Sequence, residues 1–484
     1  MNMTLTQLQT WLPKAVCVAG TSDTAQMAQT LIRAVRTDSR SVVAGDLFVA
    51  LKGDKFDGSA FLAQAQLQGA VAVLFEAQQP VHSERLPCLN GVSVPAFCVP
   101  NARAALGELA AQWRCQYTLD LIGVTGSNGK TTVTQMIASV LRADASNPAL
   151  STQGNLNNEI GVPLTLLNLR PEHRRAVVEL GMNHPGEIEV LAGYAQPTIG
   201  LVNNAQREHQ EFMATVEAVA IENAEVIRSL PANGVAVFPA QDAYTELWKK
   251  LAGPRKVLTF GFTQGDVQAH HIAWVNGAWS FQLTTAHAAC LCRLNIAGRH
   301  NILNALAATA CALAAGMDLA VIAQGLESFE PVKGRSKSSE WQIEGHAFTL
   351  VDDTYNANPD SVRAAIEVLA ELPAPRLLIL GDMGEVGQQG PEFHEEVGAY
   401  AKDLGVQTLF TLGDLCAHSS RVFEGAQHFA DMGNLQSAVL DQIATFNSVL
   451  VKGSRFMKME RVVDALRNKL EQAPALERES IHAA

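Results

Sequence analysis

Hydrophobic and polar positions alternate along this chain in the manner of an α/β protein. Short apolar runs at 46–51, 71–76, 176–180 and 199–203 predict buried strands, and segments with helical periodicity follow the last two. Continuous apolar strands that alternate with helices are typical of parallel sheets covered on both faces. The hydrophobic pattern therefore predicts an α/β fold built on parallel sheets.

The same pattern divides the chain into three units. We predict a small N-terminal α/β domain over residues 1–104, a central P-loop domain with a parallel sheet over 105–330, and a C-terminal Rossmann-like α/β domain over 331–484. The second boundary falls at PVKGRSKS, residues 331–338, where proline, glycine and basic residues interrupt the pattern. Beyond it we predict strands at 348–352, 376–380, 407–412 and 448–451, helices at 361–372 and 457–470, and a frayed polar tail.

Composition narrows the possible functions. Hydrophobic residues make up 48% of the 484 residues and charged residues 17%, which indicates a well-packed soluble protein. The net charge of -12 argues against an extended nucleic-acid surface. No apolar run reaches the roughly 18–20 residues that cross a bilayer, and the segment MNMTLTQLQTWLPK lacks the layout of a secretory signal. We therefore expect a cytoplasmic protein without a membrane span.

The eight cysteines are scattered and form no CxxC pair, so we predict that they are reduced residues of the core. Cys290 and Cys292 are separated by one residue, which places both side chains on one face of a strand. No second pair of ligands lies nearby in the sequence, so the pair does not predict a zinc site.

The clearest chemical signal is a glycine-rich segment between a predicted strand and a predicted helix. The strand that begins at Leu121 leads into TGSNGKTT at 125–132, and a helix follows directly. In this context Lys130 can reach the β- and γ-phosphates of a nucleotide, and the Thr131 hydroxyl can ligate Mg²⁺. Val124 stands where the common GxxxxGK[ST] pattern has its first glycine, and the alternative is a turn that binds nothing. The order of strand, loop and helix favours nucleotide binding by Gly126, Ser127, Asn128, Gly129, Lys130, Thr131 and Thr132.

The loop VTGSNGKTT resembles the TGxxGKTT loop of the Mur ligases and of their relative folylpolyglutamate synthetase. The segment TDSRSVVAGDLFVALKGDKFDGSAF, residues 37–61, resembles the UDP-binding domain of the Mur ligases that add the third residue or the terminal dipeptide. Central segments resemble the family in the same order, at 153–167, 178–188, 202–209 and 298–308. The resemblance implies a three-domain, ATP-dependent amide-bond ligase of bacterial cell-wall precursor synthesis.

Three C-terminal segments select a branch of the family. They are VDDTYNANPDS at 351–361, LGDMGEVG at 380–387 and VKGSRFMKME at 451–460. They resemble the branch that joins D-alanyl-D-alanine to UDP-N-acetylmuramoyl-tripeptide, whereas the diaminopimelate- or lysine-adding branch has a His-containing pattern at the first of them. The resemblance implies these two substrates, an acyl-phosphate intermediate and a UDP-muramoyl-pentapeptide product. We expect a monomer.

The resemblance also assigns roles to residues around the nucleotide. It implies that Lys130 holds the phosphates, that Thr131 and Glu179 bind Mg²⁺, and that His209 binds a second Mg²⁺ near the incoming carboxylate. Taken alone, Glu179 could be a solubilising carboxylate at a strand end and His209 an ordinary surface histidine. Asn301 and Asn304 resemble adenine contacts, although Asn301 could instead cap a helix. Arg335 and Asp353 resemble contacts to phosphate and ribose.

Substrate contacts are implied in two further regions. Ser39 and Arg40, with the FVALKG turn at 48–53, resemble the uridine-diphosphate pocket, and Asn155 and Asn158 resemble contacts to the muramoyl portion. An exposed turn is the alternative for the first pair. The residues Lys452, Ser454 and Arg455 could face the reacting groups or the dipeptide carboxylate, or could form a basic turn after a strand.

One position departs from the family pattern. Mur ligases commonly carry a lysine, modified to a carbamate that helps hold the second metal, on the helix after the segment of His209. Here residues 220–226 are AIENAEV, with Asn223 at that position and no lysine between Val202 and Leu230. We expect Glu222 or Glu225 to supply a carboxylate directly, or the second metal to rely on His209 and the substrate.

Two other functions compete with a Mur ligase. Folylpolyglutamate synthetase shares the phosphate loop but lacks an N-terminal UDP-type domain, whose motifs are present here. A nucleotide-dependent regulatory protein that has lost catalysis would be indicated by the loss of Lys130, Glu179 or His209, and all three are present. The motifs do not distinguish a tripeptide that carries diaminopimelate from one that carries lysine.

Overall fold

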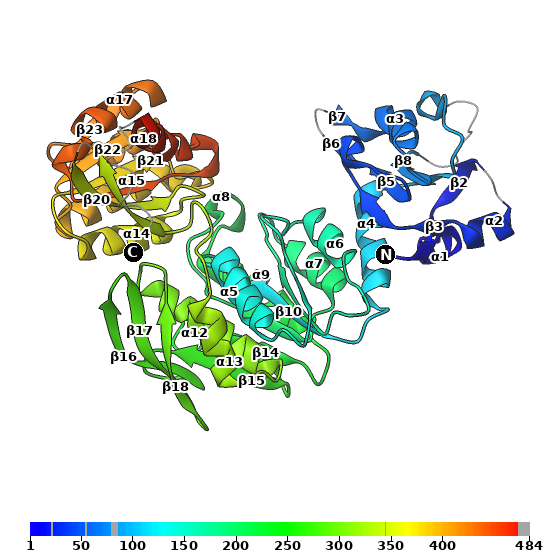
Figure 1. Cartoon of the computed structure of the whole chain (residues 1–484), viewed down its shortest axis with the longest axis horizontal. Coiled ribbons are helices and arrows are strands. Elements are labelled where there is room, and N and C mark those ends of the chain that lie inside the picture. The colour runs from blue at the N-terminus through cyan, green and yellow to red at the C-terminus, as the bar shows by residue number, and fades with distance from the viewer. Residues whose placement is uncertain (21–22, 54–55, 79–85, 344, 473–484) are drawn as a thin grey trace.

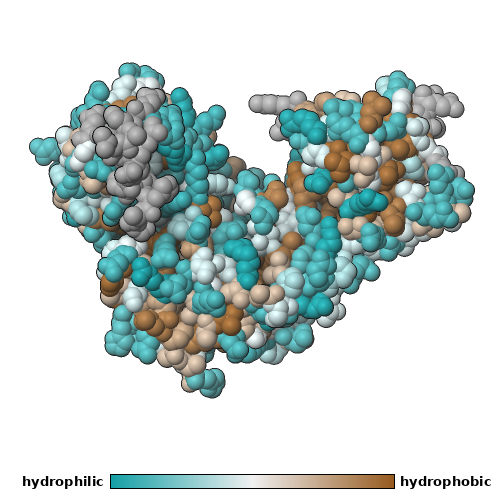
Figure 2. All heavy atoms as spheres, in the orientation of Figure 1, coloured by the Kyte–Doolittle hydropathy of each residue, from teal (hydrophilic) through white to brown (hydrophobic). Residues whose placement is uncertain are grey.

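The computed structural model describes residues 1–20, 23–53, 56–78, 86–343 and 345–472, which fold into three α/β units arranged in chain order (Figure 1). The predicted frayed tail at 473–484 lies outside the described residues. The central unit lies between the N-terminal unit, drawn in blue, and the C-terminal unit, drawn in yellow to red. Figure 2 shows a broad concavity between the two outer units, above the central one.

The N-terminal unit is built on a five-stranded sheet in the order β2-β9-β8-β5-β4, in which only β2 is antiparallel to its neighbour. Leu47 and Val49 point into one hydrophobic core and Phe48 and Ala50 into another, because successive side chains of a strand face opposite sides. The sheet is therefore covered on both faces, as the apolar run predicted. The strands and helices are β1 (Met3–Thr4), α1 (Leu5–Trp11), β2 (Val16–Ala19), α2 (Thr24–Gln29), β3 (Leu31–Ile32), β4 (Ala34–Arg36), β5 (Asp46–Ala50), β6 (Lys52–Gly53), β7 (Phe56–Asp57), α3 (Leu62–Leu67), β8 (Ala72–Glu76) and β9 (Ala96–Val99).

The central unit contains a nine-stranded sheet in the order β11-β12-β10-β13-β14-β15-β16-β17-β18. Its strands are parallel from β11 to β16 and antiparallel beyond. The strands are β10 (Asp120–Thr125), β11 (Ala149–Ser151), β12 (Arg175–Glu179), β13 (Ile199–Val202), β14 (Val235–Pro239), β15 (Lys256–Gly261), β16 (Val267–Val275), β17 (Ala278–Thr285) and β18 (Ala289–Leu294). The helices are α4 (Ala102–Arg114), α5 (Lys130–Ala143), α6 (Gly161–Leu166), α7 (Glu187–Ala195), α8 (Gln210–Met213), α9 (Val216–Asn223), α10 (Glu225–Arg228), α11 (Thr245–Ala252), α12 (His300–Ala314) and α13 (Leu319–Glu327).

The antiparallel strands β16, β17 and β18 extend the central sheet beyond the part that the sequence predicted. Cys290 and Cys292 both lie on β18, which confirms their strand spacing. The eight cysteines are free thiols, and Cys292 is buried. The prediction that the cysteines belong to the core is wrong for Cys115, which is exposed just after the end of α4.

The C-terminal unit has a six-stranded sheet in the order β19-β20-β24-β21-β22-β23, parallel except for the edge pair of β19 and β20. The strands predicted at 348–352, 376–380, 407–412 and 448–451 are confirmed as β20, β21, β22 and β24. The elements are β19 (Lys337–Ile343), β20 (His346–Asp353), α14 (Pro359–Glu371), β21 (Arg376–Gly381), α15 (Gly390–Asp403), β22 (Thr408–Leu412), α16 (Cys416–Val422), β23 (Gln427–Phe429), α17 (Met432–Gln442), β24 (Ser448–Lys452) and α18 (Glu460–Gln472).

Helix α4 connects the first two units. Asn101 caps its first turn by accepting a hydrogen bond from the backbone N–H of Ala104, at 2.9 Å. Near its other end, Trp113 Nε1 donates to the carbonyl of Leu169 at 3.2 Å, which fixes the helix on the central unit. We keep 1–104, 105–330 and 331–484 as proposed domain ranges, with α4 running across the first boundary. Among the described residues, no helix is both long and apolar enough to cross a membrane.

The order of the central strands determines where a ligand can bind. Strand β10 lies between β12 and β13, and the chain register places Val124 opposite Glu179 and Thr125 opposite Val202. The carboxyl ends of these parallel strands therefore meet at one edge of the sheet. Open α/β sheets bind their ligands at such an edge, where the strand order reverses.

Candidate active site

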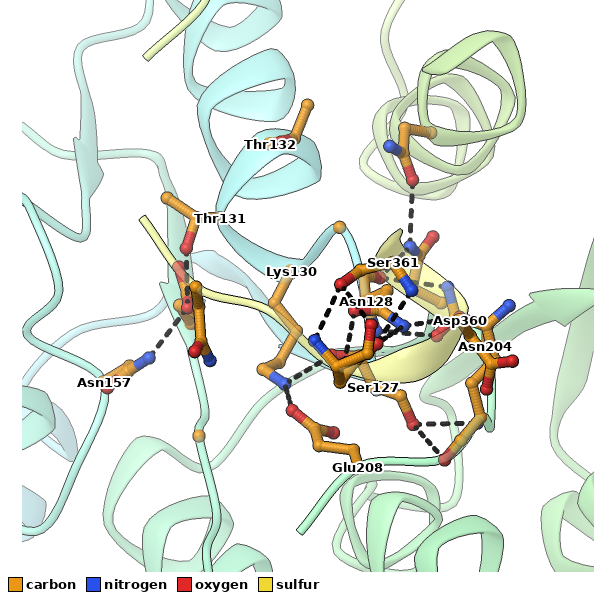
Figure 3. A pocket seen from close by; sticks show the side chains of 18 of the residues that line it. Ser127, Asn128, Lys130, Thr131, Thr132, Asn157, Asn204, Glu208, Asp360 and Ser361 are labelled. Atoms are coloured by element: carbon orange, nitrogen blue, oxygen red, sulfur yellow. Dashed lines mark hydrogen bonds and ion pairs between the residues drawn. The ribbon is translucent and has the colours of Figure 1, made fainter. Parts of the chain in front are cut away.

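A cavity of about 890 Å³ opens at this edge of the central sheet and extends to the C-terminal unit (Figure 3). The central unit contributes the loop after β10 and the ends of β12 and β13. The C-terminal unit contributes the segments around Arg335 and Asp353. The cavity brings together most of the predicted nucleotide and metal residues, which are Ser127, Asn128, Gly129, Lys130, Thr131, Thr132, Glu179, His209, Asn301, Asn304, Arg335, Asp353 and Lys452.

The loop between β10 and α5 requires its glycines. Gly126 and Gly129 have φ angles of +132° and +80°, which side chains rarely adopt. A Cβ atom on Gly129 would also lie 2.6 Å from Oδ1 of Asn304. Helix α5 begins at Lys130, and its N-terminus has no side-chain cap. Backbone N–H groups and the helix dipole therefore favour an anion here, as the phosphate-loop pattern predicts. Val124, the departure from that pattern, is a buried residue of β10.

The segment after β13 holds the phosphate loop in place. The backbone N–H of Asn128 donates to Oδ1 of Asn204 at 2.9 Å, and Ser127 Oγ accepts the N–H of Gln206 at 2.9 Å. Asn203 Nδ2 donates to the carbonyl of Asn128 at 2.8 Å. The sequence motifs did not single out Asn203, Asn204 or Gln206, although all three lie in the VNNAQREH segment.

Lys130 has an oxygen partner for each of its three ammonium protons. Its Nζ lies 2.5 Å from the carbonyl of Gly126, 3.0 Å from that of Ser127 and 2.7 Å from Oε1 of Glu208. The ion pair with Glu208 is shielded, since the two side chains are 13% and 10% exposed. A nucleotide phosphate that binds Lys130 must therefore displace at least one of these oxygens.

Glu179 and Thr131 fit a divalent cation. Thr131 Oγ1 donates to Glu179 Oε1 at 3.0 Å, and Asn157 Nδ2 donates to the same oxygen at 2.8 Å. Glu179 is 1% exposed, yet its Oε2 has no hydrogen-bond partner among the described residues. An isolated buried carboxylate oxygen is costly, and carboxylate and hydroxyl oxygens are ligands that Mg²⁺ prefers. Sequence motifs did not identify Asn157, which orients Glu179.

His209 lies between two carboxylates. Its Nδ1 is hydrogen bonded to Glu385 of the C-terminal unit, and its Nε2 lies 3.4 Å from Oε1 of Glu208. Burial lowers the pKa of His209, but the hydrogen bonds from Glu208 and Glu385 together outweigh it and raise the pKa to about 9. A carboxylate on one ring nitrogen is the usual arrangement of a metal-binding histidine. His209 and Glu385 both have left-handed backbone, with φ of +50° and +58°.

Asn301 and Asn304 take part in a row of buried amides. Asn203 Nδ2 donates to Asn304 Oδ1 at 3.0 Å, and Asn304 Nδ2 donates to Asn301 Oδ1 at 2.8 Å. Asn301 Nδ2 in turn donates to the carbonyl of Ala297 at 2.7 Å. Asn301 is therefore not the cap of α12, and the capping alternative is wrong, since Arg299 is the N-cap residue.

The C-terminal side of the cavity is organised around Asp353. Its Oδ2 accepts from Lys452 Nζ at 2.6 Å, and its Oδ1 accepts from the N–H of Ser336 at 2.9 Å. The guanidinium of Arg335 lies 4.0 Å from the ring centroid of Tyr355, a cation–π contact that holds Arg335 at the cavity wall. The predicted phosphate and ribose residues thus lie beside one another.

Comparison with known proteins agrees with this arrangement of three units around one cavity. Three family models match the chain: "Mur ligase family, catalytic domain" over residues 31–114, "Mur ligase middle domain" over 124–312, and "Mur ligase, glutamate ligase domain" over 340–455. A UDP-N-acetylmuramoyl-tripeptide–D-alanyl-D-alanine ligase from Escherichia coli K12 is 38% identical over 448 residues, covering 91% of this chain and 95% of the relative. The chain belongs to the Mur ligase family.

Solved Mur ligases have the same architecture. A crystal structure of MurF from Acinetobacter baumannii superposes with a TM-score of 0.86 and 34% identity, covering 96% of this chain and 99% of that one. MurF ligase from Thermotoga maritima, solved in complex with ADP, superposes with a TM-score of 0.77 and 26% identity, covering 91% and 98% of the two chains. The predicted three-domain α/β fold and the prediction of a Mur ligase are confirmed.

The predicted uridine-diphosphate residues of this Mur ligase lie in the N-terminal unit, away from the nucleotide cavity. A second cavity, of about 510 Å³, is lined by Thr37, Asp38 and Ser41 together with central residues. Ser39 is buried in the short helical turn Ser39–Ser41, and the exposed Arg40 pairs with Asp38. Neither Ser39 nor Arg40 is among the described residues that line this cavity.

The other predicted substrate residues are only partly brought to the main cavity. Asn158 lines it, and Asn158 Oδ1 also accepts the N–H of Gly161 at the start of α6. Lys452 lines it, but Ser454 is buried behind the wall, where its Oγ accepts the N–H of Gly384. Asn155 and Arg455 are exposed, and neither is among the lining residues that the structure describes.

The stretch that lacks the lysine of other Mur ligases has a different role here. Asn223 is buried, and its Oδ1 accepts the backbone N–H of Gly126 at 2.8 Å, which anchors the phosphate loop. The expectation that Glu222 or Glu225 supplies a metal ligand does not fit the geometry. Both oxygens of Glu222 accept N–H groups at the start of α7, and Glu225 pairs with Arg228 at 2.8 Å.

Charged and polar contacts join the central and C-terminal units beside the cavity. Arg207 lies between Asp360 on α14 and Glu396 on α15, at 2.6 and 2.7 Å. Arg363 also reaches Glu396, at 2.9 Å. Arg207 precedes Glu208 and His209 in the chain, so the C-terminal unit fixes the segment that carries them. Closure of the two units therefore completes this side of the site.

Proposed function

We propose that this Mur ligase joins D-alanyl-D-alanine to UDP-N-acetylmuramoyl-tripeptide and converts ATP to ADP and phosphate. The observation that carries the proposal is the single cavity in which Lys130, Thr131 and Glu179 face Arg335 and Asp353 of another domain. Relatives from Escherichia coli, Haemophilus influenzae and Bacillus subtilis, at 38%, 37% and 31% identity, are named for this reaction.

The cavity suits the activation of a carboxylate by ATP. A carboxylate cannot form an amide at neutral pH without a better leaving group than hydroxide, and phosphate supplies one. In the proposed first step a carboxylate oxygen of the tripeptide attacks the γ-phosphorus, the bond to the β-phosphate oxygen breaks, and ADP leaves. Lys130 and the backbone N–H groups at the start of α5 stabilise the phosphate charge in this step.

Two anions must approach each other in this reaction, so added positive charge is needed. We assign Thr131 and Glu179 as ligands of one Mg²⁺ and His209 as a ligand of a second. Bound there, Mg²⁺ would supply charge neutralisation for the phosphates and the carboxylate. The isolated Oε2 of Glu179 and the Glu385 contact on Nδ1 of His209 support this assignment.

In the proposed second step the amine of D-alanyl-D-alanine attacks the acyl carbon. The C–N bond forms, the C–O bond to phosphate breaks, and the amine loses its proton. Lys452 is buried at the cavity wall and is the C-terminal residue placed to meet an anionic group of the dipeptide or the acyl phosphate. We assign Arg335 and Asp353 to the phosphate and ribose of ATP, and Asn301 and Asn304 to its adenine.

The nucleotide-sugar would reach from the N-terminal unit to the main cavity. The second cavity, lined by Thr37, Asp38 and Ser41, is the proposed position of the uridine diphosphate, and Ser39 and Arg40 shape the turn that borders it. Asn155 and Asn158 lie between the two cavities in sequence and are assigned to the muramoyl portion. The reaction consumes ATP, so we place it in the cytoplasm, and we propose that the chain acts as a monomer.

The test is phosphate release that depends on both substrates. With ATP and Mg²⁺, the purified protein should release phosphate only when UDP-N-acetylmuramoyl-tripeptide and D-alanyl-D-alanine are both present, and mass spectrometry should detect the pentapeptide. The comparison reactions supply lysine or diaminopimelate with the shorter precursor, and glutamate with a folate. Turnover with either of these pairs, and none with the dipeptide, would assign the protein to another ligase of the same fold.

A further inference from the structure

Glu208 is a buried carboxylate between two groups of opposite function. Its Oε1 lies 2.7 Å from Nζ of Lys130 and 3.4 Å from Nε2 of His209. The residue is 8% exposed and lines the main cavity, yet its Oε2 has no hydrogen-bond partner in the described part of the chain. Figure 3 shows the carboxylate of Glu208 facing the end of the Lys130 side chain.

The arrival of ATP changes the surroundings of this carboxylate. Lys130 already has three oxygen partners, so contact with the β- and γ-phosphates requires it to give up some of them. Glu208 would then be a buried carboxylate without its cation, beside a triphosphate and the incoming substrate carboxylate. A buried unpaired anion is strongly unfavourable, so a new cation must replace the ammonium group.

Other carboxylates near His209 are committed elsewhere. Glu222 accepts two backbone N–H groups of α7, and Glu225 pairs with Arg228. Glu385 occupies Nδ1 of His209 and so leaves Nε2, on the side of Glu208, for a metal ion. Of the carboxylates considered at this histidine, Glu208 is thus the one with a buried oxygen that still lacks a partner and faces the cavity.

We propose that Glu208 is a direct ligand of the second metal ion and exchanges Lys130 for that ion when ATP binds. The proposal rests on the proposed function, since it requires ATP and a metal at His209. It assigns to Glu208 the anionic charge that a carbamate-bearing lysine would supply, in a chain with Asn223 at that position. The ion pair with Lys130 stabilises Glu208 until the nucleotide arrives.

The first test counts metal ions on the whole protein. Equilibrium dialysis with Mn²⁺ and a β,γ-methylene ATP analogue should show two bound Mn²⁺ per wild-type chain. Glu208→Gln, which keeps the shape of the side chain, should retain the first ion and bind the second at least about tenfold more weakly. Glu208→Asp should be intermediate. His209→Ala serves as the reference that lacks the second site, and Glu211→Gln, an exposed carboxylate nearby, is the matched control.

The second test uses nucleotide affinity without any metal ion. In EDTA, Glu208→Gln should bind the ATP analogue several-fold more tightly than wild type, because no carboxylate competes with phosphate for Lys130. With Mg²⁺ present the advantage should disappear or reverse. A residue with only a structural role would shift both affinities in the same direction.

The outcomes separate this proposal from the proposed function. Two Mn²⁺ bound equally well by wild type and Glu208→Gln, or only one bound by wild type, would overturn the role of Glu208 while leaving ATP-dependent ligation intact. A wild-type protein that fails to bind the analogue at all would contradict the proposed function itself. Circular dichroism of each variant checks that its fold is kept, and Glu208→Asp provides the comparison if Glu208→Gln is unfolded.

Discussion

The side-chain amides of Asn128 and Asn358 meet across the boundary between the central and C-terminal units. Asn358 Nδ2 donates to Asn128 Oδ1 at 2.9 Å, and Asn128 Nδ2 lies 3.4 Å from Asn358 Oδ1. Asn128 belongs to the phosphate loop, and Asn358 is the N-cap residue of α14, where it forms a capping box with Ser361. The start of a C-terminal helix is therefore tied directly to the loop that we assign to ATP.

Replacing Asn358 should separate its two roles. Asn358→Ser keeps an oxygen that can cap α14 but is too short to reach Asn128, so stability should change little while the KM for ATP rises several-fold. Ser361→Ala is the matched control, since it loses the capping box but leaves the amide pair in place, and it should cost about 1 kcal/mol of stability with an unchanged KM. Thermal unfolding and steady-state kinetics check both variants. Equal KM values for Asn358→Ser and wild type would refute the coupling.

The contact between Arg207 and Glu396 should make domain closure sensitive to acid. The hydrogen bond from Arg207 holds the pKa of Glu396 below its ordinary value near 4.5, against the effect of burial. A carboxyl whose folded pKa is lowered contributes stability that is present above its unfolded pKa and is lost as pH falls through the folded value. The contribution should therefore be constant from neutral pH down to about 4.5 and decline below it.

Glu396→Gln should remove this contribution. The difference in melting temperature between wild type and Glu396→Gln is then expected to shrink as the pH falls below about 4.5. Glu392→Gln, at an exposed site on the same helix, controls for the general effect of losing a carboxylate. A difference that stays constant at all pH values would show that Glu396 gains nothing from its charge.

Sequence motifs predicted the parts of the site that lie within one stretch of chain. The order of strand, glycine-rich loop and helix around Lys130 and Thr131 is local, and so is the position of Glu179 at a strand end. Asn223 and Glu385 are different, because packing of distant elements brings them to Gly126 and His209, and spacing along the chain does not encode that contact.

The error over Glu222 has the same origin. Sequence position places Glu222 next to the residue that replaces the usual lysine, but it does not specify which way a helical side chain points. In the structure, Glu222 faces the start of α7, where two unpaired N–H groups of the helix terminus require an acceptor. Its charge is used for capping, and the cavity receives Glu208 instead.

Replacing Lys130 tests the phosphate loop. Lys130→Ala should reduce ligation to background, because the variant loses the cation that contacts the β- and γ-phosphates. The fold should persist, since α5 and its buried face are unchanged, and circular dichroism should match that of wild type. The change also leaves Glu208 buried without its cation, so a modest loss of stability is expected. Ligation within a few-fold of wild type would show that the loop has been misassigned.

The last prediction concerns bicarbonate. Enzymes that hold the second metal with a carbamate need CO₂ to form it, so degassed buffer should weaken them. In this chain Asn223 stands at that position, and its amide oxygen is already bonded to the backbone N–H of Gly126 in the buried part of the loop. Activity should therefore be the same in degassed buffer and in buffer with added bicarbonate. The measurement is initial phosphate release at limiting Mg²⁺, where a weakened second metal would be most visible. A loss on degassing that bicarbonate restores would mean that a modified lysine reaches the site from elsewhere in the chain.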